Sequence, residues 1–345
     1  DIQFGTVSVA NVGWNPVMFG KSFATLPAII TSAATNNNST VLLTPRVKYT
    51  SSSRFTLQLA PWRYQNVSTL SKEDAAPYLV LAPGEYDFGG LKAIANASTK
   101  IGASWTTVVF PTPFDTVPVV FASQLLPAST FATCLRVRNV TRTGFEAKIQ
   151  KETAVTTVPS TETVSYFAIT RGKGMINGSK VIVGRTANNY VGSVYKSINY
   201  GDSIGNPVFM AQMQTCTDDT VTAALRCLSI YSKYANVVKQ RERSTGVVST
   251  LADAVGWMVI DPVGVSDEVN SPSVSGFNLY PNPATDYLAF GNENSNNMQV
   301  EIFNMYGVLV KRETIANNKI NVADLPPGSY VLKTKNWGAN KFVKL

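Results

Sequence analysis

The chain has 345 residues and no histidine, with 44% hydrophobic and 15% charged residues. The absence of histidine excludes Ser-His-Asp and Cys-His catalysis and removes the commonest metal ligand. Together with many Ser, Thr, Asn and Val residues, this composition is typical of an extracellular β-protein.

Lysine and arginine total 30 against 22 aspartates and glutamates, a net charge of +8. The positive charges are interspersed with acidic residues, and the densest group is Lys239-Gln-Arg241-Glu-Arg243. We therefore expect no nucleic-acid partner. No apolar stretch reaches 18 residues, so we expect no membrane-spanning segment. We also expect no cofactor and no metal site.

An aromatic pattern, Trp-x4-Phe-x3-Phe-x3-Pro, occurs twice with identical spacing. Its copies are Trp14-x4-Phe19-x3-Phe23-x3-Pro27 and Trp105-x4-Phe110-x3-Phe114-x3-Pro118. A third, weaker copy is expected from Tyr190-x4-Tyr195, then Pro207, Tyr234 and the apolar run Trp257-Met-Val-Ile260. A repeat of about 90 residues predicts three similar folding units. The apolar spacing favours core packing for these aromatic residues over a sugar-stacking platform.

Within each unit the sequence predicts five to seven short antiparallel strands that close as a β-sandwich. In the first unit, Val41 to Tyr49 and Phe55 to Leu59 are expected to pair. The predicted domains are units 1–90, 91–178 and 179–263, a linker at 264–276 and a smaller β-module at 277–345. The three units close on one another as an intrachain trimer or lie apart along the chain.

The last module resembles the type A sorting domain of the type IX secretion system of Bacteroidota. The matching segments are Tyr280-Pro-Asn-Pro283, Val300 to Gly307, Leu325 to Tyr330 and Lys341-Phe-Val-Lys344. The resemblance implies export to the outer cell surface and partners in the translocon and its attachment proteins. The expected signal residues are Tyr280, Pro281, Asn282, Pro283, Gly307, Gly328, Lys341 and Lys344.

The repeated unit resembles the H-type lectin domain in its Phe-x3-Phe-x3-Pro step, its turn at Thr143-Gly-Phe145 and its closing aromatic strand. That family forms trimers of six-stranded sandwiches and binds sugar near the protomer contacts. The family's sugar-binding arginine falls near Leu42, Ala132 and Val221 here, so it is not reproduced in register.

The candidate carbohydrate ligands are Trp62, Arg63 and Arg46. An exposed indole suits the C–H face of a sugar ring, and a guanidinium suits its hydroxyls. Alternatively, Trp62 covers a seam between units. Glu152 and Arg241 are expected at the corresponding position of the other two copies.

Cys216 and Cys227 are eleven residues apart and are expected to form either a disulfide or two buried thiols. Asp218-Asp219 is expected in a solvated turn, with a calcium-ligand pair as the alternative.

These patterns predict a non-enzymatic, exported protein of the cell surface with a carbohydrate-binding or adhesive head. The alternative is a structural or gliding-motility component that uses the sandwiches as protein–protein modules. A glycan hydrolase would need two carboxylates across a cleft, and no candidate pair is evident.

Overall fold

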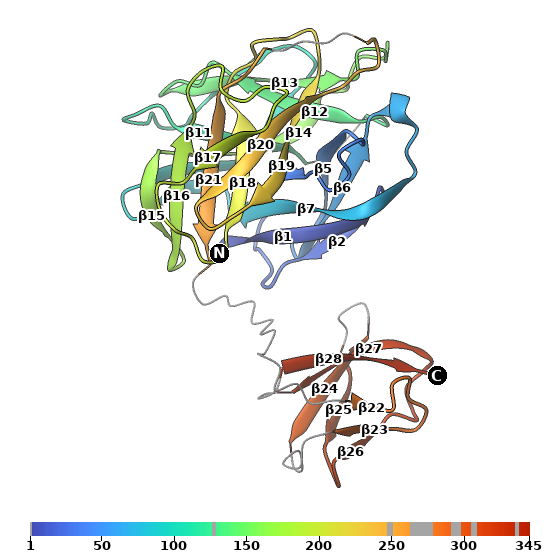
Figure 1. Cartoon of the computed structure of the whole chain (residues 1–345). Coiled ribbons are helices and arrows are strands. Elements are labelled where there is room, and N and C mark those ends of the chain that lie inside the picture. Colours follow the sequence, from blue (N-terminus) through green and yellow to red (C-terminus); the bar gives the residue numbers. More distant parts are fainter. Residues whose placement is uncertain are drawn as a thin grey trace. The chain divides into compact units, whose positions relative to one another are not determined.

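The computed structural model describes residues 2–125, 129–246, 251–262, 279–290, 298–304, 309–334 and 338–345 (Figure 1). The chain divides into two compact units, Asp1–Val263 and Gly264–Leu345. Across the described residues the regular elements are strands, apart from one 3-10 turn, η1 (Arg63–Gln65), which confirms the all-β prediction. No helix in these ranges is long and apolar enough to cross a bilayer. The predicted linker at 264–276 lies outside the described residues.

The first unit contains three repeats, each made of two sheets in which the repeat's own strands are antiparallel. The strands of repeat 1 are β1 (Ile2–Asn11), β2 (Asn15–Met18), β3 (Ala28–Thr31), β5 (Leu43–Ser51), β6 (Arg54–Pro61) and β7 (Thr69–Leu81). Those of repeat 2 are β8 (Gly84–Asp87), β9 (Lys92–Ile101), β10 (Thr106–Val109), β11 (Val119–Gln124), β12 (Thr133–Arg138), β13 (Gly144–Lys151) and β14 (Glu162–Ile169). Those of repeat 3 are β15 (Gly172–Ile176), β16 (Ser179–Arg185), β17 (Lys196–Asn199), β18 (Val208–Met213), β19 (Ala223–Ile230), β20 (Tyr234–Arg241) and β21 (Val255–Asp261).

The sheet orders repeat in the same way. The inner sheets run β1-β7-β3, β11-β14-β9-β8 and β15-β16-β21-β18, and the outer sheets run β2-β6-β5, β10-β13-β12 and β17-β20-β19-β4. β8 and β15 precede the boundaries expected at residues 90 and 178, yet they pair with the strands that follow them. β4 (Ala34–Thr35) lies in the sequence of repeat 1 but pairs, in parallel, with β19 of repeat 3.

The register of the outer sheets corrects the expected third copy of the aromatic pattern. Val17 pairs with Phe55 in repeat 1, and Val108 pairs with Phe145 in repeat 2. In repeat 3 the matching pair is Ile198 with Ala235, so Tyr234 does not correspond to Phe55. The third copy is therefore Tyr195-x4-Tyr200-x3-Ile204-x2-Pro207 rather than one that starts at Tyr190. The backbone N–H groups of Tyr200 and Ile204 make the same hydrogen bonds as those of the Phe pairs in the other two copies.

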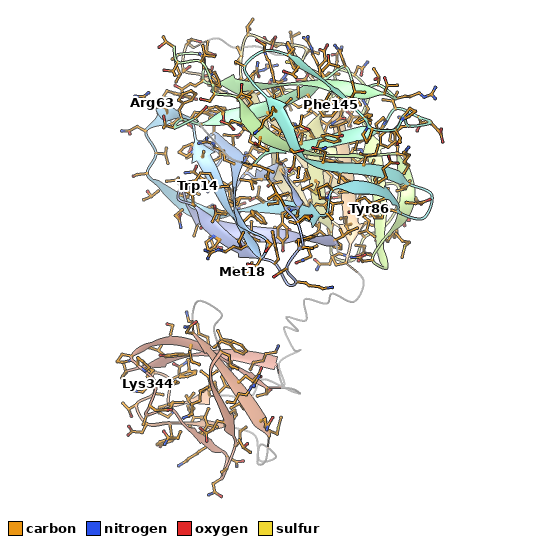
Figure 2. The ribbon with its side chains drawn as sticks, turned by 180° about the vertical axis from the view of Figure 1, so that it is seen from behind. Trp14, Met18, Arg63, Tyr86, Phe145 and Lys344 are labelled. Atoms are coloured by element: carbon orange, nitrogen blue, oxygen red, sulfur yellow. The ribbon has the colours of Figure 1, made fainter. Side chains whose placement is uncertain are left out.

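The Phe residues of the pattern are buried as expected, whereas Trp14 is 40% exposed and reaches the surface (Figure 2). Phe19 and Phe23 meet edge to face at 5.3 Å, and Phe110 and Phe114 meet in the same way at 5.1 Å. The two copies thus build the same corner of two sandwiches.

Alternating residues of the inner strands enter two different cores. On β14, Tyr166 and Ala168 pack inside the repeat 2 sandwich, whereas Phe167 and Ile169 join a cluster that contains residues of all three repeats. β21 alternates likewise, because Met258 joins the shared cluster and Trp257 does not. Successive side chains of a strand point to opposite faces, so the inner sheets are covered on both sides. The three repeats therefore form one body around a common centre.

The second unit is a smaller two-sheet module. Its strands are β22 (Leu279–Tyr280), β23 (Tyr287–Phe290), β24 (Gln299–Asn304), β25 (Leu309–Thr314), β26 (Lys319–Asn321), β27 (Gly328–Thr334) and β28 (Gly338–Lys344). The sheet orders are β22-β23-β26 and β25-β24-β27-β28.

Candidate functional site

Three arginines at corresponding positions connect the repeats in a closed ring. Arg136 of repeat 2 lies 3.3 Å from the carboxylate of Asp253 in repeat 3, and both side chains are fully buried. Arg226 of repeat 3 lies 3.0 Å from Asp74 of repeat 1, again with both side chains fully buried. Each carboxylate precedes the aromatic residue of its closing strand by four positions.

The third link joins Arg46 of repeat 1 to repeat 2 through the backbone. Its Nη2 donates to the carbonyl of Ser129 over 2.7 Å, and the Ser129 N–H donates to Glu162 over 3.3 Å. Burial lowers the pKa of Arg46, and the carboxylate of Glu162 opposes that shift. The links run from repeat 1 to 2, from 2 to 3 and from 3 back to 1, so the repeats are arranged as a cyclic trimer within one chain.

Edge strands of the inner sheets are capped by side chains of neighbouring repeats. The hydroxyl of Ser123 accepts from Thr31 N–H at 2.8 Å and donates to Thr31 C=O at 3.0 Å. Gln214 does the same for the N–H and C=O of Val120, at 2.9 and 2.8 Å. Ser32 accepts from the N–H of Ala211 at 2.7 Å. These bonds satisfy backbone groups that unpaired edges leave open.

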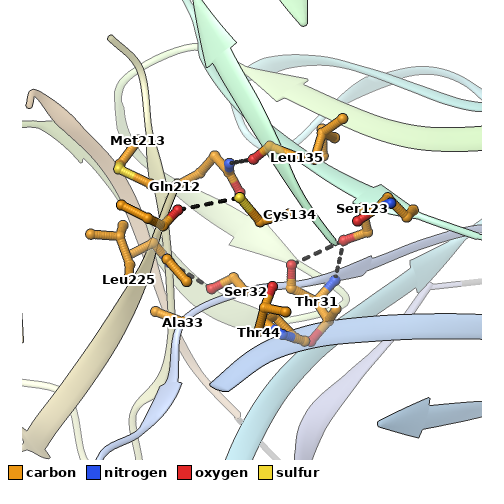
Figure 3. A pocket seen from close by; sticks show the side chains of 16 residues that line it. Thr31, Ser32, Ala33, Thr44, Ser123, Cys134, Leu135, Gln212, Met213 and Leu225 are labelled. Carbon is orange, nitrogen blue, oxygen red and sulfur yellow. Dashed lines mark hydrogen bonds between the residues drawn. The ribbon is translucent and has the colours of Figure 1, made fainter. Parts of the chain in front are cut away.

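A small cavity of about 50 Å³ lies where the three repeats meet (Figure 3). Ser32, Ser123 and Gln212 contribute to its lining from one corresponding position in each repeat. Thr44, Cys134 and Ala224 contribute from another. The volume holds a few water molecules at most, so this cavity is a packing feature of the centre rather than a carbohydrate site.

The structure does not bring the candidate carbohydrate ligands together as an exposed site. Trp62 is 1% exposed and packs with Ala132 and Cys134 of repeat 2, so it covers a seam between repeats, as the alternative interpretation has it. Arg46 is 5% exposed and committed to Ser129. Arg63 alone is exposed, at the start of η1 (Figure 2). The expectation that Trp62 is an exposed stacking platform is therefore wrong.

The three cysteines are free thiols, so the disulfide between Cys216 and Cys227 is not present. Cys227 lies in the core of repeat 3, and burial raises the pKa of its thiol to about 12. Cys216 lies by the Asp219 loop, with its Sγ 3.4 Å from the carbonyl of Asp218. The two thiols thus belong to different environments.

Asp219 is exposed, as expected for a turn, but it also contacts repeat 2, whereas Asp218 is 8% exposed and accepts from Thr220 within repeat 3. Asp219 forms an ion pair with Lys148 and accepts from Trp105 Nε1 at 3.0 Å and Gln150 Nε2 at 3.1 Å. The described residues contain no group of three or more Asp, Glu or Cys side chains that could hold a metal ion.

The outer sheets leave hollows where two repeats meet. The hollow between repeats 3 and 1 has a volume of about 550 Å³, and its lining includes Asn36, Tyr195, Gln240, Arg241 and Arg243. The hollow between repeats 2 and 3 has about 210 Å³ and is lined in part by Lys148 and Asp219. At the third junction Trp62 covers Ala132, the counterpart of Leu42. The Trp62 position of repeat 3 is Glu242 in the observed register, not Arg241.

In the second unit, the Tyr280-Pro-Asn-Pro283 motif is bonded to the last strand. The side chain of Asn282 accepts from Val343 N–H at 2.9 Å and donates to Lys341 C=O at 3.2 Å. Ala284 continues this contact, because its N–H donates to Val343 C=O at 2.7 Å. The two ends of the predicted signal are thus adjacent. Gly328 begins β27, Lys344 is 9% exposed, and Gly307 lies outside the described residues.

These features define an all-β protein with a two-sheet C-terminal module. Residues 278–345 match the family model described as a secretion system C-terminal sorting domain. The module identifies the chain as cargo of the type IX secretion system of Bacteroidota, which carries it to the cell surface or outside. No curated protein and no solved structure matches the chain. The lectin resemblance of the repeats has no family match to support it.

Proposed function

We propose that the three repeats form a non-enzymatic head that binds carbohydrate outside the cell and so makes the exported protein adhesive. The observation that carries the proposal is the polar hollow of about 550 Å³ between repeats 3 and 1. Sites for small ligands have roughly 300–1,000 Å³. Asn36 donates to the phenol oxygen of Tyr195 and accepts from Gln240 Nε2 at 3.0 Å, and the remaining donor and acceptor capacity of these amide and phenol groups suits sugar hydroxyls.

The same lining supports binding without turnover. Glycoside hydrolysis requires two carboxyl groups on either side of the scissile bond. The residues that line this hollow include no aspartate and no glutamate. A bound sugar would therefore meet donors and a partly buried ring, but no acid–base pair.

A glycan array that contains neutral and acidic oligosaccharides tests the proposal with the full-length protein. We expect binding to a restricted set of glycans and no release of sugar from the bound ones. Uniform lack of binding, both on the array and to surface polysaccharide, would contradict the proposed head.

A second candidate is a structural or gliding-motility component whose repeats bind protein. The burial of Trp62 and Arg46 in repeat contacts favours it, because these residues serve the assembly of the head. In that case deletion of the gene alters surface spreading, and the full-length protein captures a surface protein in the presence of excess oligosaccharide.

A further inference from the structure

The three junctions between repeats are equivalent in backbone but differ in side chains. Phe55, Phe145 and Ala235 correspond to one another in register. Pro61, Lys151 and Arg241, which end the same three strands, therefore also correspond to one another. The loops opposite these strands correspond in the same way, so Ser39 of repeat 1 is the counterpart of Asp219 of repeat 3. The three junctions therefore differ in whether their own side chains fill the space that a ligand would need.

At two of the junctions, side chains of the repeats themselves fill or pair the surface, although Nε of Arg46 and of Arg136 also lacks a hydrogen-bond partner among the described residues. Between repeats 1 and 2, Trp62 packs on Ala132 and Cys134. Between repeats 2 and 3, the carboxylate of Asp219 is paired with Lys148 and hydrogen-bonded by Trp105 and Gln150. Between repeats 3 and 1 there is neither a covering indole nor an acidic side chain in the lining.

At this open junction the guanidinium of Arg241 is incompletely bonded. Arg241 is 7% exposed, and its Nη2 donates to the carbonyl of Leu251. Within the described part of the chain, Nε and Nη1 have no hydrogen-bond partner. Buried donors without an acceptor are uncommon in folded proteins. An incoming acceptor is the simplest way to satisfy them.

The nearby carboxylates are engaged elsewhere. Asp253 is bonded to Arg136 at 3.3 Å and to Lys239, and Asp218 accepts from Thr220 N–H at 3.0 Å. Burial lowers the pKa of Arg241, and these two carboxylates oppose that shift. Arg243, which is exposed, adds a second cation to the lining. The wall of the hollow therefore carries positive charge from Arg241 and Arg243, and Nε and Nη1 of Arg241 are buried donors within that wall.

We propose that the hollow between repeats 3 and 1 binds an acidic carbohydrate, with the uronate carboxylate or sulfate ester of the sugar at Arg241. The identification of the ligand as a carbohydrate rests on the proposed function, whereas the preference for an anion rests on Arg241. Oxyanions bind arginine through charge-assisted hydrogen bonds, which are stronger than those between neutral groups. Asn36, Tyr195 and Gln240 lie in the same lining, and in this assignment their polar groups contact the hydroxyls of the ring.

Calorimetric titration of the full-length protein tests the assignment with three probes: a galacturonate hexamer, a chondroitin sulfate hexasaccharide and a neutral maltohexaose. We expect the protein to bind at least one acidic probe, and Arg241→Gln to weaken that binding tenfold or more. Arg171→Gln is the matched control, because Arg171 lines a different hollow. Its binding should equal that of the wild type. Loss of binding in Arg171→Gln alone would place the site elsewhere and overturn the assignment.

Ser39→Asp is a second variant that leaves Arg241 in place. Ser39 is exposed and lines the hollow, and aspartate is the residue of the corresponding position in repeat 3. We expect the introduced carboxylate to occupy the cationic site and to weaken the binding of acidic probes by a similar factor. If Arg241→Gln does not fold, as judged by its circular dichroism and thermal midpoint, Ser39→Asp decides the outcome.

Failure of the assignment and failure of the proposed function give different results. Equal binding of a neutral or acidic glycan by wild type, Arg241→Gln and Ser39→Asp overturns the assignment and leaves the binding head intact. Absence of all carbohydrate binding, with weak binding of inorganic sulfate that Arg241→Gln abolishes, contradicts the carbohydrate function and retains the anion site. Absence of binding to both the carbohydrates and sulfate overturns the assignment as well.

Discussion

At the scale of single residues, the repeats are joined by buried charges placed at corresponding positions. Arg136 and Asp253 form the best-defined link, since Lys239 also donates to the same carboxylate oxygen. A buried ion pair adds little stability over an apolar pair, but the loss of one member leaves a charge without compensation. We therefore infer that these buried arginine contacts specify which repeat packs against which more than they strengthen the fold.

Replacement of Asp253 by alanine leaves Arg136 and Lys239 buried without a counter-charge. We expect the free energy of unfolding of the first unit to fall by about 3–5 kcal/mol. Urea unfolding measures the change. Glu146→Gln serves as the control, because its ion pair with Arg138 is partly exposed, and it should cost about 1 kcal/mol or less. Equal effects of the two substitutions would contradict the role given to the buried pair.

The same carboxylate predicts a dependence of stability on pH. Burial would raise the pKa of Asp253, but Arg136 and Lys239 outweigh burial and hold the pKa below its usual value. The stabilising contribution is therefore complete above about pH 4, near the pKa of an aspartate in an unfolded chain, and is lost as the pH falls through the lower pKa of the folded state. The difference in unfolding free energy between wild type and Asp253→Asn should be constant from pH 7 to about 5 and should shrink below pH 4. A difference that stays constant to pH 2.5 would exclude this linkage.

At the scale of elements, edge strands meet near the centre and are capped by side chains instead of further strands. The strands themselves, and several of their turns, could be predicted from alternating apolar residues and from the repeated Phe-x3-Phe-x3-Pro step. The caps could not, because Ser32, Ser123 and Gln214 differ in type and their partners lie more than 90 positions away in sequence. The pairing of β4 with repeat 3 could not be predicted either, because a strand of two residues has no periodic pattern.

Gln214 provides the element-scale test, because its side chain replaces a strand partner for Val120. Gln214→Ala leaves a buried N–H and a buried C=O without partners, and we expect a loss of about 2–4 kcal/mol. Gln58→Ala is a matched control, since Gln58 is only part-buried and donates to Val12 C=O at 2.7 Å. Chemical denaturation of both variants should separate them by more than 1 kcal/mol. Indistinguishable midpoints would mean that Val120 finds other partners.

The candidate site was harder to predict than the fold for a physical reason. Trp62 and Arg46 have the residue types of a sugar site, but burial decides whether they can touch a ligand, and burial here depends on the neighbouring repeat. The one-residue error at Tyr234 also assigned Arg241 to the wrong position. The sequence does show Arg46, Arg136 and Arg226 on the same strand of each copy, and the signal that points to their partners is an acid four positions before each closing aromatic residue.

At the scale of the whole molecule, contacts between the three repeats join the first unit into one compact body. Its central apolar cluster contains residues of all three repeats, including Ile29, Phe121 and Met210. No repeat can lose its structure without exposing the apolar faces of the other two. A repeat in a linear array, by contrast, depends only on its nearest neighbours.

We therefore expect the first unit to unfold in one cooperative transition. Tryptophan fluorescence reports on all five tryptophans, among them Trp62 at the seam between repeats 1 and 2 and Trp257 in repeat 3. Far-ultraviolet circular dichroism reports on all strands. The two probes should give coincident denaturation curves for the first unit, and Asp253→Ala in repeat 3 should shift both by the same amount. A fluorescence transition that Asp253→Ala leaves unmoved would show that the repeats unfold separately.

Covalent linkage of the three repeats has a consequence for how many ligands one molecule can hold. An assembly of identical subunits presents every junction three times. In this chain one junction is filled by Trp62, a second has a smaller hollow whose lysine is paired with Asp219, and the third has the larger hollow without a carboxylate. A single molecule would therefore be monovalent for the proposed anionic sugar. Avidity, in that case, has to come from the density of molecules displayed on the bacterium.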